Sequence, residues 1–238
     1  MTSSQLALAF AVVLIGSAIQ GSVGFGLSLF AAPLLVLIDP VLVPGPAIVG
    51  SSVLNLLVMR REDAPGAWTE LRRPIIAQVP GALAGAALVA LVATDNITIF
   101  FSLMILLAVG LSISGLHPPR SPRNLTIAGA ASGFMGTAVG IGGPPLALLY
   151  QRADGPTIRG RLSRYFACAS VVSLVMLAIF GQFTIDDLRT GLVLIPAAIL
   201  GYLASSLLLG RVNAAVVRVA VLALSAASAV VALVRSLT

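Results

Sequence analysis

The chain repeats a pattern of glycines, prolines and charges at a constant offset of 116 residues, without a gap. Because the residues around these matches are almost wholly apolar and of membrane-span length, the pattern predicts two copies of one membrane unit. We expect a first repeat over residues 1–116, a connector over 117–123 and a second repeat over 124–238. The matches are Val23-Gly24-Phe25-Gly26 with Val139-Gly140-Ile141-Gly142, Pro40 with Pro156, Glu70-x-x-Arg73 with Asp186-x-x-Arg189, Pro80 with Pro196, and Gly85 with Gly201.

The composition excludes a soluble protein, because 58% of the residues are apolar and 9% are charged. All 14 basic residues are arginines at the ends of apolar segments, and no basic patch is interleaved with aromatic residues. The basic charge therefore indicates membrane topology, and we expect no nucleic-acid partner.

The lone Cys168 excludes an intramolecular disulfide and a cysteine metal cluster. We expect no cleaved signal peptide, since the first residues lack a basic region.

Several segments have the length of about 20 residues that a helix needs to cross the hydrocarbon core. Two further regions, 5–38 and 124–151, are too long for one span and are interrupted by glycines. Their arms of about 9 to 16 residues are too short to cross, so each region predicts a re-entrant or broken helical hairpin. The predicted spans are 41–59, 74–93, 97–115, 163–181, 188–209 and 213–235.

The arginines predict the orientation of these segments, because cytoplasmic loops accumulate positive charge. Twelve of the 14 fall in alternate loops, and only Arg189 and Arg235 fall at the opposite ends. This assignment places residues 60–73 in the cytoplasm and their counterpart, 176–189, outside. The expected fold is therefore an all-α integral membrane protein with two inverted-topology repeats, each a broken hairpin plus three transmembrane helices. The N-terminus would be extracytoplasmic, in a plasma or inner membrane.

The glycine-rich hairpin tips are expected near the membrane midplane, where a non-helical backbone survives only inside protein or beside a polar cavity. Glycine N–H groups can approach a ligand closely, and a restarting helix points its positive dipole end at that ligand. A small anion is the expected cargo. The predicted substrate-binding residues are Gln20, Gly21, Ser22, Gly24, Gly26, Ser51, Ser52, Asn55, Gly136, Thr137, Gly140, Gly142 and Gly143.

Other interpretations of these residues stay open. Glycines in membrane helices also serve close helix packing, the interpretation we favour for Gly81 and Gly85. The serines, Asn55 and Gln78 could instead form interhelical hydrogen bonds. Nucleotide binding is excluded, because a phosphate-binding loop needs a lysine and the chain has none.

Acidic residues and His117 fall at loops or segment ends rather than in the middle of a span. The sequence therefore offers no catalytic group, proton relay or metal ligand set, and we expect neither an enzyme nor a cofactor. A secondary transporter that works by alternating access about a midplane site is the expected function. An anion channel is the first alternative to this function, and an intramembrane enzyme is the second. The expected partners are a small anionic substrate and the lipid bilayer, and a homo-oligomer is compatible with the sequence.

Two motifs carry a family resemblance. They are Gln20-Gly-Ser-Val-Gly-Phe-Gly followed by Ala32-Pro33-Leu34-Leu35, and Gly133-Phe-Met-Gly-Thr-Ala-Val-Gly-Ile-Gly-Gly-Pro-Pro. With two halves of these proportions, the chain resembles the TauE/SafE sulfite exporter family of membrane permeases over essentially its whole length. The resemblance implies export or exchange of a small sulfur-containing or organic anion such as sulfite, sulfoacetate or thiosulfate.

Overall fold

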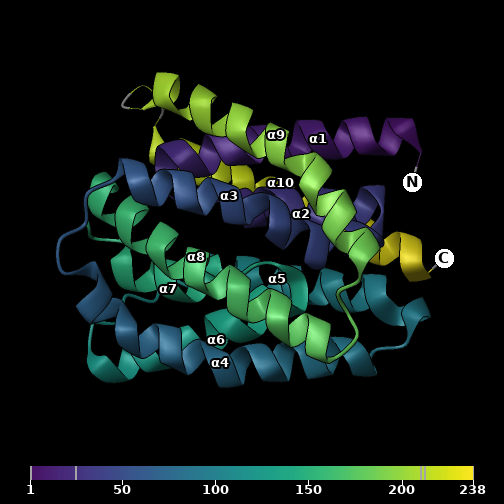
Figure 1. Cartoon of the computed structure of the whole chain (residues 1–238), viewed down its shortest axis with the longest axis horizontal. Helices are drawn as coiled ribbons and strands as arrows, with labels where there is room; N and C mark the ends of the chain where they lie inside the picture. Colours follow the sequence, from purple (N-terminus) through teal and green to yellow (C-terminus); the bar gives the residue numbers. More distant parts are fainter. Residues whose placement is uncertain (1, 25, 210, 212, 238) are drawn as a thin grey trace.

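The computed structural model describes residues 2–24, 26–209, 211 and 213–237, and these residues form helices and turns with no strand (Figure 1). Phe25 of the first glycine motif lies outside the described residues. The first half contains α1 (Ser3–Val23), α2 (Leu27–Ile38), η1 (Pro40–Leu42), α3 (Gly45–Arg61), α4 (Ala67–Leu91), η2 (Thr94–Asn96) and α5 (Ile97–Ile113). The second half contains α6 (Pro122–Val139), α7 (Gly143–Tyr150), α8 (Gly155–Ile179), α9 (Ile185–Leu208) and α10 (Ala214–Leu237).

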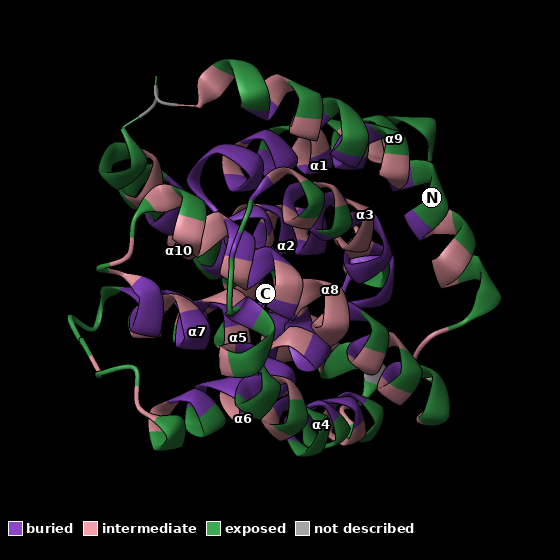
Figure 2. Cartoon of the chain, turned by 60° about the vertical axis from the view of Figure 1, so that its left-hand side comes forward, coloured by how far each residue is buried: buried purple, intermediate pink, exposed green. Residues whose placement is uncertain are grey.

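The prediction of an all-helical membrane protein is confirmed. Six stretches in the described residues are long and apolar enough to cross a membrane, and large apolar side chains such as Leu107 and Val171 are exposed on the outside of the bundle. Figure 2 shows buried residues turned toward the inside and exposed ones outward. So much exposed apolar surface would be unfavourable in water, so the outside of the bundle faces lipid. The six stretches are 3–23, 40–61, 67–91, 155–179, 185–208 and 214–236.

The expectation that all hairpin arms are too short to cross is wrong for the first arm. Helix α1 has 21 residues, about 31 Å of rise, and α6 has 18, whereas the second arms α2 and α7 have 12 and 8. The first arms run on through Gly21 and Gly136, since an unbroken helix satisfies every backbone hydrogen bond where no water is present. The predicted span 97–115 is also a helix, α5, but it is two residues shorter than predicted, with 17 residues.

Both hairpins break at glycines. Helix α1 ends at Gly24 with φ 102°, α2 begins after Gly26 with φ 124°, and α6 ends at Gly140 with φ 74°. A side chain rarely adopts these positive φ values, so only glycine turns the chain here without strain. Gly142 has an ordinary φ of -85°, but a Cβ there would lie 2.9 Å from the carbonyl oxygen of Ser132. The breaks are thus fixed by backbone conformation and by close approach.

Helices of the two halves correspond at the 116-residue offset. Helix α1 ends at Val23 and α6 at Val139, while α2 begins at Leu27 and α7 at Gly143. Their contacts are reciprocal, since α1 packs along α9 and α6 packs along α4, while α3 contacts α8 and α5 contacts α10. This pattern is the one that two halves related by a two-fold axis would make. The opposite membrane orientation of the halves stays a prediction.

Small residues allow the closest helix contacts. A Cβ on Gly85 of α4 would overlap the backbone of Phe134 in α6, and a Cβ on its repeat counterpart Gly201 in α9 would overlap Leu14 in α1. Gly129 lies against Pro74 in the same way. These contacts support the packing interpretation of Gly85, because backbones this close leave no room for a side chain.

Polar caps hold the helix ends at the loops. Asp154 lies at the N-cap of α8, where its carboxylate accepts a hydrogen bond from the Thr157 N–H. Hydrogen bonding with Thr157 holds the pKa of Asp154 below its ordinary value, because it favours the charged carboxylate. Thr184 and Asp187 form a reciprocal capping box at the start of α9.

Candidate functional site

A small polar cavity lies where the two hairpins approach each other, with a volume of about 40 Å³. Both hairpins and the central parts of α3 and α8 contribute to its wall. None of the described lining residues is acidic or basic, so neutral hydrogen-bonding groups set its chemistry. We call it the central cavity. It is lined by Gln20, Ser28, Ile48, Ser51, Asn55, Ser132, Gly136, Gly140, Gly142, Phe166, Ala169, Ser170 and Ser173.

The first hairpin and α3 are joined in this wall by a side-chain hydrogen bond. Gln20 Nε2 donates to Asn55 Oδ1 at 2.8 Å, and both residues are buried. The bond uses the nitrogen of the Gln20 amide and the oxygen of the Asn55 amide. Asn55 Nδ2 makes no hydrogen bond within the described residues, so it is a free donor at the cavity wall.

Hydroxyl groups supply the remaining polar side chains. Ser51 and Ser170 donate back to carbonyls of their own helices, at 3.0 and 2.8 Å. Ser28, at the start of α2, makes no side-chain hydrogen bond within the described part of the chain. Since a hydroxyl can rotate its proton toward a ligand, Ser28 and Asn55 are the readiest side-chain donors.

Residues of the second hairpin also line the central cavity. Ser132 donates to the Gly142 carbonyl at 2.5 Å, which ties the break to α6. A Cβ on Gly140 would meet no atom within 4 Å, so this glycine faces open space. A Cβ on Gly136 would lie 3.4 Å from the Gly142 Cα. These glycines therefore bring the backbone close to the cavity, although the Gly140 N–H donates to the Gly136 carbonyl within the helix end.

Helix α2 offers N–H donors at its first turn. The N–H groups of Leu27 and Ser28 have no partner in the described residues, and Gly26 supplies no side-chain cap. In α7, Pro144 and Pro145 occupy first-turn positions and carry no N–H. The positive end of α2 is therefore the stronger backbone contribution to an anion site.

Six of the predicted site residues line the central cavity: Gln20, Ser51, Asn55, Gly136, Gly140 and Gly142. The structure places the other predicted site residues in its surroundings rather than in the lining. Gly21 packs on Ser205, Ser22 donates to the Ala18 carbonyl at 2.8 Å, and Ser52 donates to the Ile48 carbonyl at 2.7 Å. Thr137 shares a 2.7 Å hydrogen bond with Ser173, and Gly143 starts α7. Gly24 and Gly26 carry the backbone turn.

Three serines of the second half line the central cavity but were not among the predicted site residues. Ser132, Ser170 and Ser173 line the central cavity, and the latter two lie one helical turn apart on α8. A polar pair at that spacing in an apolar span is a signal that the repeat comparison overlooked, because their first-half counterparts, Leu54 and Leu57, are apolar.

Arg61 and Arg159, which were interpreted from the sequence as topology markers, also make hydrogen bonds to the first hairpin. Glu62, only 9% exposed, accepts hydrogen bonds from Arg159 Nε at 2.7 Å and from Arg61 Nε at 3.1 Å. The same two arginines donate to the carbonyl groups at the end of α1: Arg61 to Gly21 and Arg159 to Ser22. These carbonyls have no partner inside their helix, so the arginines cap it. Arg61 also lies over the Tyr202 ring of α9.

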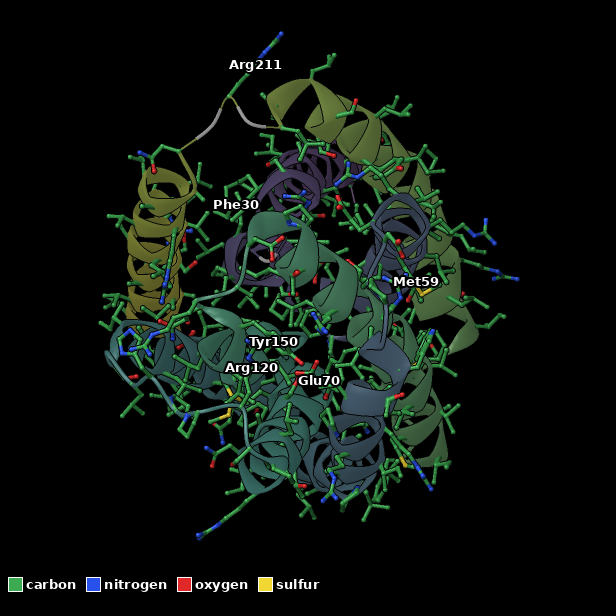
Figure 3. The ribbon with its side chains drawn as sticks, turned by 90° about the vertical axis from the view of Figure 1, so that its left-hand side faces the viewer. Phe30, Met59, Glu70, Arg120, Tyr150 and Arg211 are labelled. Atoms are coloured by element: carbon green, nitrogen blue, oxygen red, sulfur yellow. The ribbon has the colours of Figure 1, made fainter. Side chains whose placement is uncertain are left out.

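A second ionic cluster joins α4, α7 and α8. Glu70 pairs with Arg161 at 2.8 Å and accepts a hydrogen bond from the Tyr150 hydroxyl at 3.0 Å. Arg120 of the connector lies over the Tyr150 ring, and Figure 3 shows Glu70, Tyr150 and Arg120 together. The cluster fixes the end of α7, and so the second hairpin, to neighbouring helices.

The fold and the central cavity define a class, the multi-pass α-helical membrane proteins in which a small polar cavity lies between two broken hairpins. The family model described as sulfite exporter TauE/SafE matches residues 8–232, and the chain belongs to this family. This result confirms the resemblance and the assignment to membrane transport, in a family of transporters rather than enzymes. The searches against curated proteins and solved structures returned no match.

Proposed function

We propose that the protein is a secondary transporter that exports a small anion, sulfite or a small organosulfur or organic anion, by alternating access around the central cavity. The observation that carries the proposal is the meeting of two helix breaks at a cavity whose described lining residues include neutral donors and no acidic side chain. A buried anion loses its hydration and needs donors in exchange, and an acidic neighbour would repel it.

The size of the central cavity favours a compact cargo. A buried water needs roughly 10–15 Å³ of such volume, so about 40 Å³ corresponds to about three waters. An oxyanion with four heavy atoms, such as sulfite, is close to this size. A longer anion such as sulfoacetate would require the helices to separate further.

Asn55 Nδ2, the Ser28 hydroxyl and the N–H groups at the start of α2 would replace the hydration water of the anion. Alternating access would move one half of the inverted pair against the other, with the hairpins as the moving elements. The arginine-rich ends would face the cytoplasm. Exit of an anion would then be favoured by an inside-negative potential, at about 2.3 kcal/mol per charge for 100 mV.

Transport in proteoliposomes tests this proposal. Radiolabelled sulfite uptake would be measured for wild type, Asn55→Leu, and Ser206→Ala, whose exposed hydroxyl bonds only to its own helix. We expect saturable uptake with counterflow in wild type and Ser206→Ala, and loss of uptake in folded Asn55→Leu protein. Flux that neither saturates nor shows counterflow would identify a channel, and unchanged uptake in Asn55→Leu would remove the site from the central cavity.

A further inference from the structure

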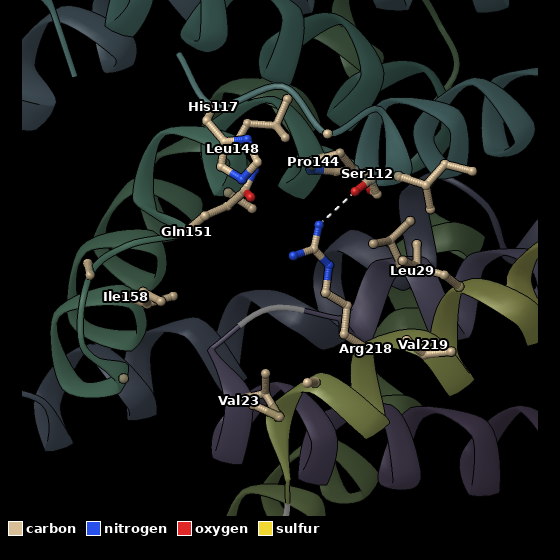
Figure 4. A pocket seen from close by; sticks show the side chains of 18 residues that line it. Val23, Leu29, Ser112, His117, Pro144, Leu148, Gln151, Ile158, Arg218 and Val219 are labelled. Carbon is tan, nitrogen blue, oxygen red and sulfur yellow. Dashed lines mark hydrogen bonds between the residues drawn. The ribbon is translucent and has the colours of Figure 1, made fainter. Parts of the chain in front are cut away.

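A second, larger cavity of about 680 Å³ lies beside the hairpins, between α2, α5, α7 and α10. We call it the large cavity (Figure 4). Its walls are mostly apolar and include Leu29, Leu148, Val219 and Leu222. Its volume lies in the range of sites for small organic molecules, about 300–1,000 Å³, and far exceeds the central cavity.

Arg218 is the one arginine among the described lining residues of this cavity. Figure 4 shows its guanidinium reaching into the cavity, with a hydrogen bond from Nη2 to the Ser112 carbonyl at 2.6 Å. No carboxylate pairs with Arg218 in the described part of the chain, and no described lining residue is acidic. A half-buried cation with apolar neighbours and free donors favours an anion as partner.

The hydrogen bond to Ser112 alone does not account for this arginine. The contact caps the last turn of α5, which is a structural role. A guanidinium has five N–H donors in a planar fork, so one bond leaves most of them open to the cavity. The repeat counterpart of Arg218 is Ser102, which is buried and bonds to its own helix at Thr98. The cation therefore exists in one half only.

We propose that the large cavity is a second anion site, which binds a water-soluble organic monoanion with its acid group on Arg218 and its apolar body against Leu29, Leu148 and Leu222. The cavity ends at the connector and at the first turn of α10, through His117 and Ala214. Both segments belong to the arginine-rich side, so the ligand enters from the cytoplasm.

A bound ligand also blocks the cytoplasmic approach to the central cavity. Neighbouring residues of both hairpins line the two cavities, since Leu29 follows Ser28 and Pro144 lies two residues after Gly142 in the chain. A ligand in contact with Leu29 and Pro144 stands beside the breaks. This inhibition rests on the proposed function, whereas the binding does not.

Binding is tested by calorimetry with the full chain in nanodiscs of neutral phosphatidylcholine. The probes are hexane-1-sulfonate, methanesulfonate and sulfate, with empty nanodiscs as the blank. We expect stoichiometric binding of hexane-1-sulfonate, at least about tenfold weaker binding of the other two, and at least about tenfold loss in Arg218→Gln. Arg211→Gln, an exposed arginine before the same helix, leaves binding unchanged, and Arg218→Lys restores part of it.

Ala215→Trp, which places a bulky side chain at the wall of the large cavity and keeps the arginine, covers the case in which Arg218→Gln does not fold. It is expected to abolish hexane-1-sulfonate binding. Equal binding in wild type and in either cavity variant, or equal binding of sulfate and hexane-1-sulfonate, would overturn the site. Loss of binding when anionic phosphatidylglycerol is added to the nanodiscs would assign the cavity to lipid and would also overturn it.

Sulfite transport separates this proposal from the proposed function. Hexane-1-sulfonate on the arginine-rich side is expected to inhibit sulfite transport by wild type but not by Arg218→Gln. Asn55→Leu is expected to lose transport while it binds hexane-1-sulfonate normally. If wild type binds the probe through Arg218 but transports no sulfite, the transport proposal fails and the second site stands. If sulfite transport is intact and no probe binds, the second site fails alone.

Discussion

Gln20 and Asn55 are joined by a 2.8 Å hydrogen bond inside the helix bundle, from Gln20 Nε2 to Asn55 Oδ1. The bond links the last turn of α1 to α3 across 35 residues of sequence. It leaves Asn55 Nδ2 without a hydrogen-bond partner in the described residues, in a side chain that lines the central cavity. Asn55 thus has two roles: its Oδ1 accepts the interhelical hydrogen bond from Gln20, and its Nδ2 is a donor for the proposed site.

The first prediction concerns this pair. Asn55→Leu leaves the buried Gln20 amide without its partner, so we expect a loss of about 1–3 kcal/mol in the free energy of unfolding. The double variant Gln20→Leu/Asn55→Leu is expected to recover part of this loss, because two apolar side chains leave no unsatisfied group. Chemical unfolding of wild type, both single variants and the double variant in detergent measures the coupling. Strictly additive effects would show that the bond contributes nothing.

The second prediction concerns Glu62. Glu62→Ala leaves Arg61 and Arg159 without a carboxylate in a largely buried position, and we expect a loss of about 3–5 kcal/mol in stability. Asp186→Ala is the matched control, because its ion pair with Arg189 is 82% and 72% exposed. A solvent-exposed pair contributes less than about 1 kcal/mol. Similar unfolding midpoints for the two variants would contradict a structural role for the Glu62 cluster.

The third prediction separates backbone strain from steric overlap at the second hairpin. Gly140→Ala meets no neighbouring atom but forces a positive φ on alanine, at a cost of about 1–2 kcal/mol. Gly110→Ala, in α5, has open space and helical φ, so it is expected to stabilise the protein by up to about 1 kcal/mol. Thermal unfolding of both variants checks the difference. Equal midpoints would mean that the left-handed turn is not required.

The fourth prediction concerns the reciprocal helix pairs. Alanine at Gly85 would collide with the backbone of α6, and alanine at Gly201 would collide with the backbone of α1. Each substitution is expected to destabilise by about 1–3 kcal/mol, because backbone moves less readily than a side chain. Because both glycines meet backbone of the facing helix, we expect similar losses, measured by thermal unfolding against Gly110→Ala. A neutral result at either glycine would show that this helix pair can separate freely.

The sequence predicted the helical breaks well because their cause is local. Glycines that need positive φ, such as Gly24 and Gly140, are recognised from the two motifs and their common offset. The lengths of the hairpin arms were predicted less well. Gly21 and Gly136 suggest interruption in sequence, but in the structure they are small residues in close contact within continuous helices.

The candidate site could be predicted only in part. Gln20 and Asn55 were recognised as polar residues in apolar spans, whereas the sequence does not indicate which of the serines face the central cavity. Arg159 and Glu62 lie 97 residues apart, and no pattern in the sequence pairs them. Arg218 was interpreted as one of twelve topology markers, since a cation at a helix end is ordinary at a membrane surface.

The sequence by itself determined the membrane environment, the helical class and the places where the chain breaks. These properties follow from hydropathy, periodicity and glycine conformation, which act over a few residues. The tertiary structure alone decided which polar groups meet in the central cavity, which carbonyls Arg61 and Arg159 cap, and that Arg218 enters a cavity without a carboxylate partner in the described residues. Such relationships depend on the packing of helices that are distant in the sequence, because burial and hydrogen-bond geometry are set by the neighbours that each side chain meets in space.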